Sequence, residues 1–315
     1  MSIYKHQDMS QILSLPATYS KEFLNYDRVF PLIDNKLQGL IQQVNKQAMP
    51  AEDHNFLDQS MTIMNVREVV TRDLFNNFKT LFQSSLESSS LNDFQGLNSA
   101  YRVDICLGCT QYIDSLYMRF GLKGIQVLER EYTYHQRLNA NLSYKTIDTL
   151  EANKPLIISQ PFFYGKTHEQ MNLILDRCLE LNIPVHVDGA WITACKNISV
   201  NFNHPAIRSF AVSMSKGYGL SGWNRIGVRW TKEESVDAIT IMNDFVQIPA
   251  QTVAVGLFFL KNVKADHLWL THVFHYNTIC KDFGLTPTDS IHLAMDGDHP
   301  VGVEVLLRYL EKSHE

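Results

Sequence analysis

The sequence has few cysteines and no long apolar run. Its 5 cysteines among 315 residues form an odd set without the density of a disulfide scaffold. Cys106 and Cys109 have the spacing of a zinc or redox pair, but no second pair completes such a site. No segment approaches the ~20 apolar residues that span a bilayer, and the first residues lack the apolar stretch of a signal peptide. We therefore expect reduced thiols, no metal, no membrane partner and a cytoplasmic location.

The sequence also lacks blocks of like charge. Its formal net charge is -5, and no run of five or six residues of one sign suggests a surface for nucleic acid. Hydrophobic residues make up 45% and charged residues 19%, which is ordinary globular composition. With roughly 150 residues per domain, the length predicts two lobes. The composition therefore predicts a soluble folded protein, and nucleic acid is not expected as a partner.

The N-terminal part is predicted to be helical. Apolar residues recur every three or four positions from Ile63 to Phe82, which predicts an amphipathic helix ending near Phe82. The polar stretch 83–90 is interpreted as a loop or a helix end. We expect residues 1–90 to contribute to a small domain, 91–235 to form a large domain, and 236–315 to form a shortened C-terminal small domain.

Short apolar strands alternate with helices after residue 100. Strands are expected at 102–107, 125–128, 155–159, 183–188, 210–213 and 226–230, and helices at 110–120 and 168–181. This alternation predicts an α/β fold with a largely parallel sheet between helices. Such sheets bind ligands at the carboxyl ends of their strands, so the residues that follow the strands are the candidates for a site.

The segment from Ser213 to Gly227 is the most informative of these. A lysine between hydroxyls and followed by glycines can sit at a strand end, close to a phosphate held by Ser213 and Arg225. Arginine is suited to clamp a phosphate through two hydrogen bonds. The segment resembles the cofactor-lysine motif of class I/II aminotransferases, in which Ser-x-Ser-Lys is followed by Gly-Leu, a small loop, Arg and Gly. Lys216 and Arg225 are one residue further apart than is usual in that family.

The resemblance implies a cofactor, pyridoxal 5'-phosphate (PLP), bound to Lys216 as a Schiff base, with Ser213, Ser215 and Arg225 around it. Asp188 ends a strand, where a buried carboxylate needs a partner. In the family the partner is the protonated pyridine nitrogen, which makes the ring an electron sink. Taken alone, Asp188 could equally be a helix cap or a turn residue.

Three further positions fit a cofactor site. Gly108-Cys109-Thr110 lies between a strand and a helix, where free backbone N–H groups favour an anion, and it resembles the family's phosphate-binding Gly-x-Thr. Tyr134 resembles the aromatic residue that stacks on the pyridine ring. Trp191 replaces the family's tyrosine and either donates through its indole N–H or packs in the core. The family's asparagine is missing, and Gln160 or Tyr164 could replace it as a donor.

The C-terminal segment departs from the family. His292 stands where an arginine commonly binds the substrate carboxylate, and histidine lacks the guanidinium fork. It is the candidate substrate residue. Arg308 is the only arginine after position 229 and is expected to be exposed on a terminal helix.

The resemblance implies a fold-type-I PLP-dependent transferase, a homodimer, acting as an aminotransferase on an amino acid or related amine. Lys216 and Asp188 would be its catalytic residues, with Lys216 moving the proton. The departures at the Asn, Tyr and Arg positions leave two alternatives open. One is a PLP-dependent decarboxylase, lyase or oxidase, and the other is a non-catalytic PLP-fold binding protein.

Overall fold

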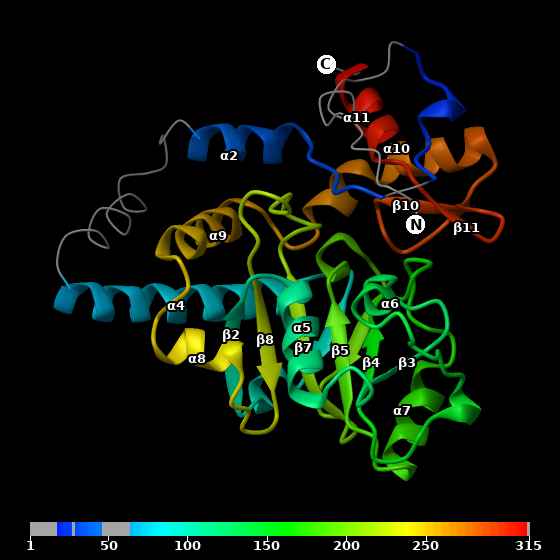
Figure 1. The fold of residues 1–315 in the computed structure, drawn as a ribbon. Helices are drawn as coiled ribbons and strands as arrows, with labels where there is room; N and C mark the ends of the chain where they lie inside the picture. Colours follow the sequence, from blue (N-terminus) through cyan, green and yellow to red (C-terminus); the bar gives the residue numbers. More distant parts are fainter. Residues whose placement is uncertain (1–17, 27–28, 46–63, 314–315) are drawn as a thin grey trace.

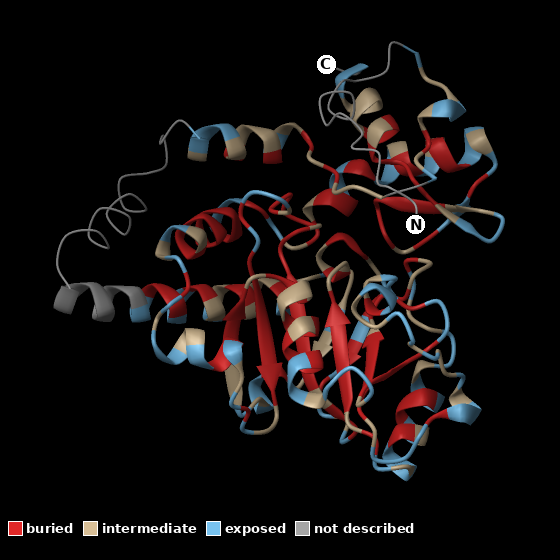
Figure 2. Cartoon of the chain, viewed as in Figure 1, coloured by how far each residue is buried: buried red, intermediate tan, exposed pale blue. Residues whose placement is uncertain are grey.

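The computed structural model describes residues 18–26, 29–45 and 64–313, with side chains of the long N-terminal helix from Arg72 onward. A large body contains a central sheet with helices on its faces, and a smaller body containing the chain's last helix packs above it (Figure 1). The strands of the central sheet are almost wholly buried (Figure 2). The sheet is therefore the core on which the candidate site is built.

The central sheet has six strands in the order β2-β8-β7-β5-β4-β3. They are β2 (Arg102–Cys106), β3 (Gln126–Val127), β4 (Leu156–Ser159), β5 (Val185–Gly189), β7 (Ile207–Ser213) and β8 (Gly227–Thr231). The pairs from β3 to β7 are parallel, whereas β8 is antiparallel to both β7 and β2. The predicted α/β class with a mostly parallel sheet is confirmed, and β8 is the strand that reverses.

Helices connect the strands. Two of them, α5 (Cys109–Phe120) and α7 (Met171–Glu180), correspond to the predicted helices at 110–120 and 168–181, whereas the short α6 (Tyr134–Leu138) was not predicted. In α5 the apolar residues Ile113 and Leu116 are buried, and the helix contacts β2, β5 and β7. A short parallel pair, β1 (Asp93–Gln95) and β6 (Ser199–Asn201), lies outside the main sheet.

The long helix α4 (Met64–Glu87) packs along α9 (Ala250–Asn262). The contact is close at Gly256, where an added Cβ would lie 2.7 Å from a ring carbon of Phe78. The predicted end near Phe82 is wrong, because the helix continues to Glu87 through a segment in which Leu86 is buried and Gln83 and Ser85 hydrogen-bond to Trp230 and Tyr218. Ile63 and the side chains up to Thr71 lie outside the described part of the chain.

The smaller body combines both ends of the described chain. Its antiparallel sheet consists of β9 (Thr286–Pro287), β10 (Leu293–Asp296) and β11 (His299–Gly302), and its helices are α10 (His267–Phe283) and α11 (Glu304–Ser313). The N-terminal segment reaches it through a bridge between Asn25 and Gly302. The helix α2 (Asn35–Asn45) follows this segment.

Helix α8 (Ala238–Asp244) contacts β2 and α5, and α9 contacts α4, so both lie beside the central sheet. The smaller body therefore gathers the N-terminal segment and the elements from α10 onward. The division at residues 90 and 235 stays a proposal. Among the described helices, none is both long enough and apolar enough to cross a membrane.

Candidate functional site

The carboxyl ends of β2, β5 and β7 meet at one edge of the central sheet. Because β8 is reversed, the residues that precede it return to this same edge. The register pairs Ser213 with Gly227, so the loop between the two strands brings Lys216 and Arg225 to one place. The extra residue in this loop, relative to the family, leaves the strand pairing intact.

Gly108, Thr110, Ser213 and Arg225 form a small polar cradle at this edge. Arg225 Nη2 donates a hydrogen bond of 2.6 Å to Thr110 Oγ1. Gly108 has a φ of +82°, and a Cβ there would lie 3.3 Å from Ser213 Oγ and 3.4 Å from Arg225 Nη2. Glycine adopts this φ without strain and leaves the space beside the guanidinium and hydroxyl groups clear. The structure thus brings together the four residues that the sequence predicts around a phosphate.

The backbone around Lys216 is held by hydroxyl groups. Ser213 Oγ donates to Ser215 Oγ at 2.8 Å and accepts from the Ser215 N–H at 3.1 Å. On the other side, Thr193 Oγ1 accepts from the Gly217 N–H at 3.1 Å and donates to the Ser213 carbonyl at 3.2 Å. Sequence reasoning missed Thr193, because a lone threonine two residues after Trp191 gives no local signal.

Lys216 extends over an aromatic face. Its Nζ lies 4.3 Å from the centre of the Trp191 ring, a distance at which a cation is attracted to the π-system. Trp191 in turn meets the His292 ring edge-on at 5.6 Å. The structure therefore places Trp191 and His292 beside the lysine, as the chain order predicts.

Asp188 is 4% exposed and lies at the end of β5. Its Oδ1 accepts from the Ala190 N–H at 2.9 Å. Burial raises the pKa of Asp188, and the Cys109 thiol and the Ala190 N–H lower it in part. No ion pair to Asp188 is found within the described ranges of the chain, so this carboxyl group is suited to a cationic ligand atom.

Cys109 turns its side chain away from the polar cradle. The thiol is buried and donates to the Ala211 carbonyl at 3.5 Å, and burial raises the pKa of Cys109. A thiol in this state is inert. A contact between Cys109 and a phosphate would therefore use its backbone N–H at the start of α5, and stays a prediction.

Tyr134 begins α6, and its hydroxyl donates to Asp114 Oδ1 at 2.7 Å. Its ring is stacked on that of Tyr132, with centres 5.8 Å apart. Burial and Asp114 raise the pKa of Tyr134 to about 12, so it is a neutral aromatic platform. Its stacking on a cofactor stays a prediction.

The replacements considered for the family's asparagine have other contacts. Gln160 Nε2 donates to Thr167 Oγ1 at 3.2 Å and to the Ser199 carbonyl at 2.9 Å. The Tyr164 hydroxyl accepts from the Glu169 N–H at 3.3 Å. Tyr164 therefore holds its own loop together, and Gln160 connects that loop to β6.

His292 is buried, and its Nδ1 accepts from the Leu32 N–H at 3.0 Å. Burial, reinforced by Lys216 and His272, lowers the pKa of His292 to about 3. The ring is therefore neutral and offers an N–H at Nε2 but no positive charge. It cannot replace the charge of an arginine opposite a carboxylate.

Two buried acids, Glu131 and Glu304, were not predicted as site residues from the sequence. Glu131 accepts from the N–H and the hydroxyl of Ser159, both at 2.6 Å, and burial raises its pKa to about 7. Glu304 begins α11 and accepts from the Phe30 N–H at 3.3 Å. Burial raises the pKa of Glu304 to about 7, against the opposing charge of Lys216. The sequence does contain one indication of Glu131 as a site residue, because it lies three residues after the predicted strand 125–128.

A cavity of about 250 Å³ lies at the opposite edge of the sheet, where Pro184 and Ala206 precede β5 and β7. Its described lining includes Glu233 and Arg208 but has no hydroxyl side chain, unlike the edge around Lys216. Open parallel sheets bind ligands at the carboxyl edge, so the chemistry and the topology both favour the Lys216 edge.

Neither a family profile nor a curated protein matches the sequence. The fold is similar to a PLP-bound C-S lyase from Staphylococcus hominis, with a TM-score of 0.58 and 10% identity over 91% of this chain and 89% of that chain. It is also similar to a putative aminotransferase from Burkholderia pseudomallei, with a TM-score of 0.56 and 11% identity over 92% of this chain and 97% of that chain. A histidinol-phosphate aminotransferase from Clostridium acetobutylicum gives a TM-score of 0.52 and 10% identity over 91% and 99%. The chain has the fold of the fold-type-I PLP-dependent enzymes.

Proposed function

We propose that this chain is a PLP-dependent enzyme that acts on the amino group of an amino acid or related amine, with amino-group transfer as the preferred reaction. The observation that carries the proposal is the convergence of three parts at one sheet edge. These are the lysine, the cradle around Arg225 and the buried Asp188.

The residues fit the cofactor chemically. The phosphate needs hydrogen-bond donors, which Arg225, Thr110 and Ser213 provide next to the space left by Gly108. The pyridine nitrogen needs an acid, and Asp188 is a buried carboxyl group without a cationic partner in the described ranges. When bound, PLP supplies an electron sink that stabilises negative charge at the substrate carbon.

The chain itself supplies binding and proton transfer. Lys216 Nζ would hold the cofactor and, once released, move a proton to or from the substrate Cα. Thr193 and Ser213 keep the backbone of Lys216 in position through the hydrogen bonds on either side of it. The ring face of Trp191 provides an apolar, electron-rich surface next to the Lys216 amine.

Decarboxylation or elimination is the second candidate, and His292 is the observation that favours it. A neutral imidazole does not hold a substrate carboxylate as an arginine does. A substrate whose carboxylate is weakly held, or absent, suits these reactions better than transfer between two amino acids.

Absorbance tests the cofactor. Protein mixed with PLP should develop a band near the visible edge, and borohydride reduction should fix the cofactor mass on the Lys216 peptide. Protein without the band, or with the label on another lysine, contradicts the proposal.

A panel of amino acids, with and without a keto acid, distinguishes the reactions. Conversion of the cofactor to its amine form and appearance of a new amino acid support transfer. Release of CO2 or ammonia without an acceptor supports the second candidate. A bound cofactor without turnover of any substrate supports a binding protein.

The proposal includes a cytoplasmic homodimer with sites near the interface. Light scattering during gel filtration should give twice the 36.2 kDa mass of one chain. A mass of one chain contradicts the dimer and leaves the cofactor test unaffected.

A further inference from the structure

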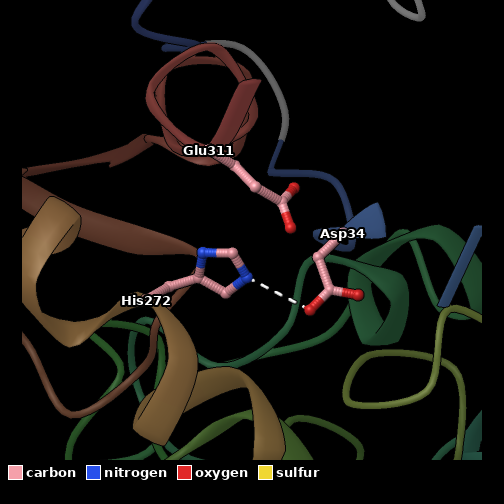
Figure 3. Close-up of side chains that lie close together, drawn as sticks. All are labelled: Asp34, His272 and Glu311. Carbon is pink, nitrogen blue, oxygen red and sulfur yellow. Dashed lines mark hydrogen bonds and ion pairs between the residues drawn. The ribbon is translucent and has the colours of Figure 1, made fainter. Parts of the chain in front are cut away.

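Three ligand-type side chains from distant parts of the sequence meet in the smaller body. Asp34 precedes α2, His272 lies on α10, and Glu311 lies on α11. One potential ligand atom of each lies within 4.8 Å of the others. Figure 3 shows the imidazole and the two carboxylates pointing toward one another.

The spacing is close to that of ligands around one ion. His272 Nε2 and Asp34 Oδ2 are 3.1 Å apart. Two ligands of a tetrahedral zinc ion, each ~2.0–2.2 Å from the metal, lie roughly 3.3–3.5 Å apart. For this pair a shift of a few tenths of an ångström would suffice, and the Glu311 oxygen, which lies within 4.8 Å of both, would approach by rotation of its half-buried side chain.

The first carboxylate is already oriented by neighbours. Asp34 Oδ1 accepts from the Leu37 N–H at 2.9 Å, and Oδ2 lies 2.6 Å from His267 Nε2. Hydrogen bonds of this kind fix ligating carboxylates in metal sites. His267 is thus a positioning residue for Asp34.

The second carboxylate is also held in place. The Asn35 N–H lies 3.2 Å and 3.3 Å from the two oxygens of Glu311. Because Asn35 directly follows Asp34 in the chain, this contact keeps the Glu311 carboxylate close to Asp34. Asp34 is only 1% exposed, and its neighbours His267 and His272 are cations only when protonated, so a divalent cation would supply a permanent positive charge beside the two carboxylates.

His272 can bind an ion without losing another hydrogen bond. It is 1% exposed, and its Nδ1 has no hydrogen-bond partner among the described residues. An ion bound at Nε2 would replace the hydrogen bond between Nε2 and Asp34 Oδ2, and the imidazole proton would then reside on Nδ1. The cation would be shared by the His272 nitrogen and the Asp34 carboxylate.

We propose that Asp34, His272 and Glu311 bind one divalent transition-metal ion, best matched by zinc, with water completing the coordination. A mixed imidazole and carboxylate set suits zinc, whereas magnesium prefers oxygen ligands alone. The expectation of no metal from the sequence depended on the cysteines and did not consider this set. The site is independent of PLP.

The ion would join the start of α2 to α10 and α11. Leu32, two residues before Asp34, donates the N–H that fixes the tautomer of His292 beside Trp191. Metal binding would thus stabilise the segment that positions His292 and, through His292, the Trp191 ring of the candidate active site.

Zinc itself is the probe. The full chain is stripped with a chelator and titrated with zinc against a chromophoric indicator, and bound metal is measured after desalting. We expect about one equivalent per chain, not displaced by excess magnesium. Less than half an equivalent in the folded wild-type protein would overturn the proposal.

Variants assign the site. Glu311→Gln and Asp34→Asn should each weaken zinc binding at least about tenfold. Glu311 is half-buried on the last turns of α11, so Glu311→Gln decides the question if Asp34→Asn does not fold, as judged by circular dichroism. Glu180→Gln at an exposed position of α7 and His299→Gln at an exposed position of β11 are the matched controls and should bind zinc as the wild type does. Equal zinc affinity in Glu311→Gln and the controls would contradict the site.

Discussion

At the scale of single residues, Lys216 is the most direct test of the proposed chemistry. Lys216→Ala removes the amine that would hold the cofactor and move the proton. Turnover should fall by ~10²–10⁴ or more, which is the usual contribution of a positioned acid–base group. The measurement is the initial rate with the best substrate of the amino-acid panel, together with loss of the borohydride label. Lys166→Ala, on an exposed position, is the control and should retain both.

Arg225 is expected to act as the phosphate clamp. Arg225→Lys keeps the charge but loses the planar fork that now reaches Thr110. Since hydrogen bonds to charged groups contribute about 1.5–3 kcal/mol, PLP should bind roughly 10- to 100-fold more weakly. A titration followed by absorbance measures this, with Arg177→Lys on α7 as the control. Unchanged PLP affinity in Arg225→Lys would place the phosphate elsewhere.

Glu131 gives a pH dependence of known sign. Its folded pKa of about 7 lies above the ordinary value of 4.5, so the native state keeps a proton that the unfolded chain releases. The free energy of unfolding therefore falls as pH rises from 4.5 through 7, by about 3 kcal/mol at most from this group.

Glu131→Gln removes this contribution. Its unfolding free energy relative to wild type should rise between pH 5 and pH 8, as measured by urea denaturation at each pH. The neighbouring exposed Glu129→Gln should give a constant difference from wild type. A constant difference for Glu131→Gln as well would show that Glu131 is ionised throughout.

At the scale of elements, a buried ionic network connects β8 to β2 and α8. Arg229 is 2% exposed and donates to Asp104 Oδ2 at 2.7 Å, to Asp237 Oδ2 at 2.5 Å and to Thr240 Oγ1 at 3.1 Å. Arg229→Met leaves the half-buried Asp237 without this cation, and Asp104 keeps its ion pair with Arg102 but loses the one with Arg229. The free energy of unfolding should fall by about 3–5 kcal/mol, measured by denaturant titration.

A surface pair provides the comparison. Arg119 lies 3.1 Å from Glu233, and both side chains are at least one-third exposed. Arg119→Met should cost less than about 1 kcal/mol, because water screens such pairs. Similar losses in the two variants would mean that the Arg229 network contributes no more than a surface contact.

The elements show what the sequence could predict and why. Short apolar runs indicated the strands of the central sheet, which are buried on both faces, and a period of 3.6 indicated the helices, which bury one face. The end of α4 was misplaced because its last turn has one buried residue, Leu86, among polar ones. The pairing of β8 between β2 and β7 depends on contacts distant in sequence, and no local pattern encodes it.

The same distinction applies to the site. Lys216, Arg225, Asp188 and Gly108 were found because a glycine, a strand end or a hydroxyl-flanked lysine gives a local signal. The neutral state of His292 could not be predicted, because it follows from burial and from an N–H supplied by Leu32 at the other end of the chain.

At the scale of the whole molecule, the cradle residues come from α5, β7 and the start of β8, so a ligand there should stabilise the entire large body. PLP at 100 times its dissociation constant adds about 2.7 kcal/mol if it binds only the native state. For a chain of this size that corresponds to roughly 5 °C in the melting temperature, measured by differential scanning fluorimetry. Arg225→Lys at the same PLP concentration should show a smaller rise. An equal rise in both would indicate binding away from the cradle.

The smaller body is built from the two ends of the described chain. Asn25 pairs with Gly302, the Leu32 N–H donates to His292, and Asp34 lies against His272. During synthesis, the N-terminal segment therefore cannot make these contacts until residues more than 230 positions later have been added. The central sheet can form during translation. The contacts of His292 with Leu32 and Trp191 can be completed only after the C-terminal residues have left the ribosome. A protein released early by truncation would have a folded sheet and no finished site.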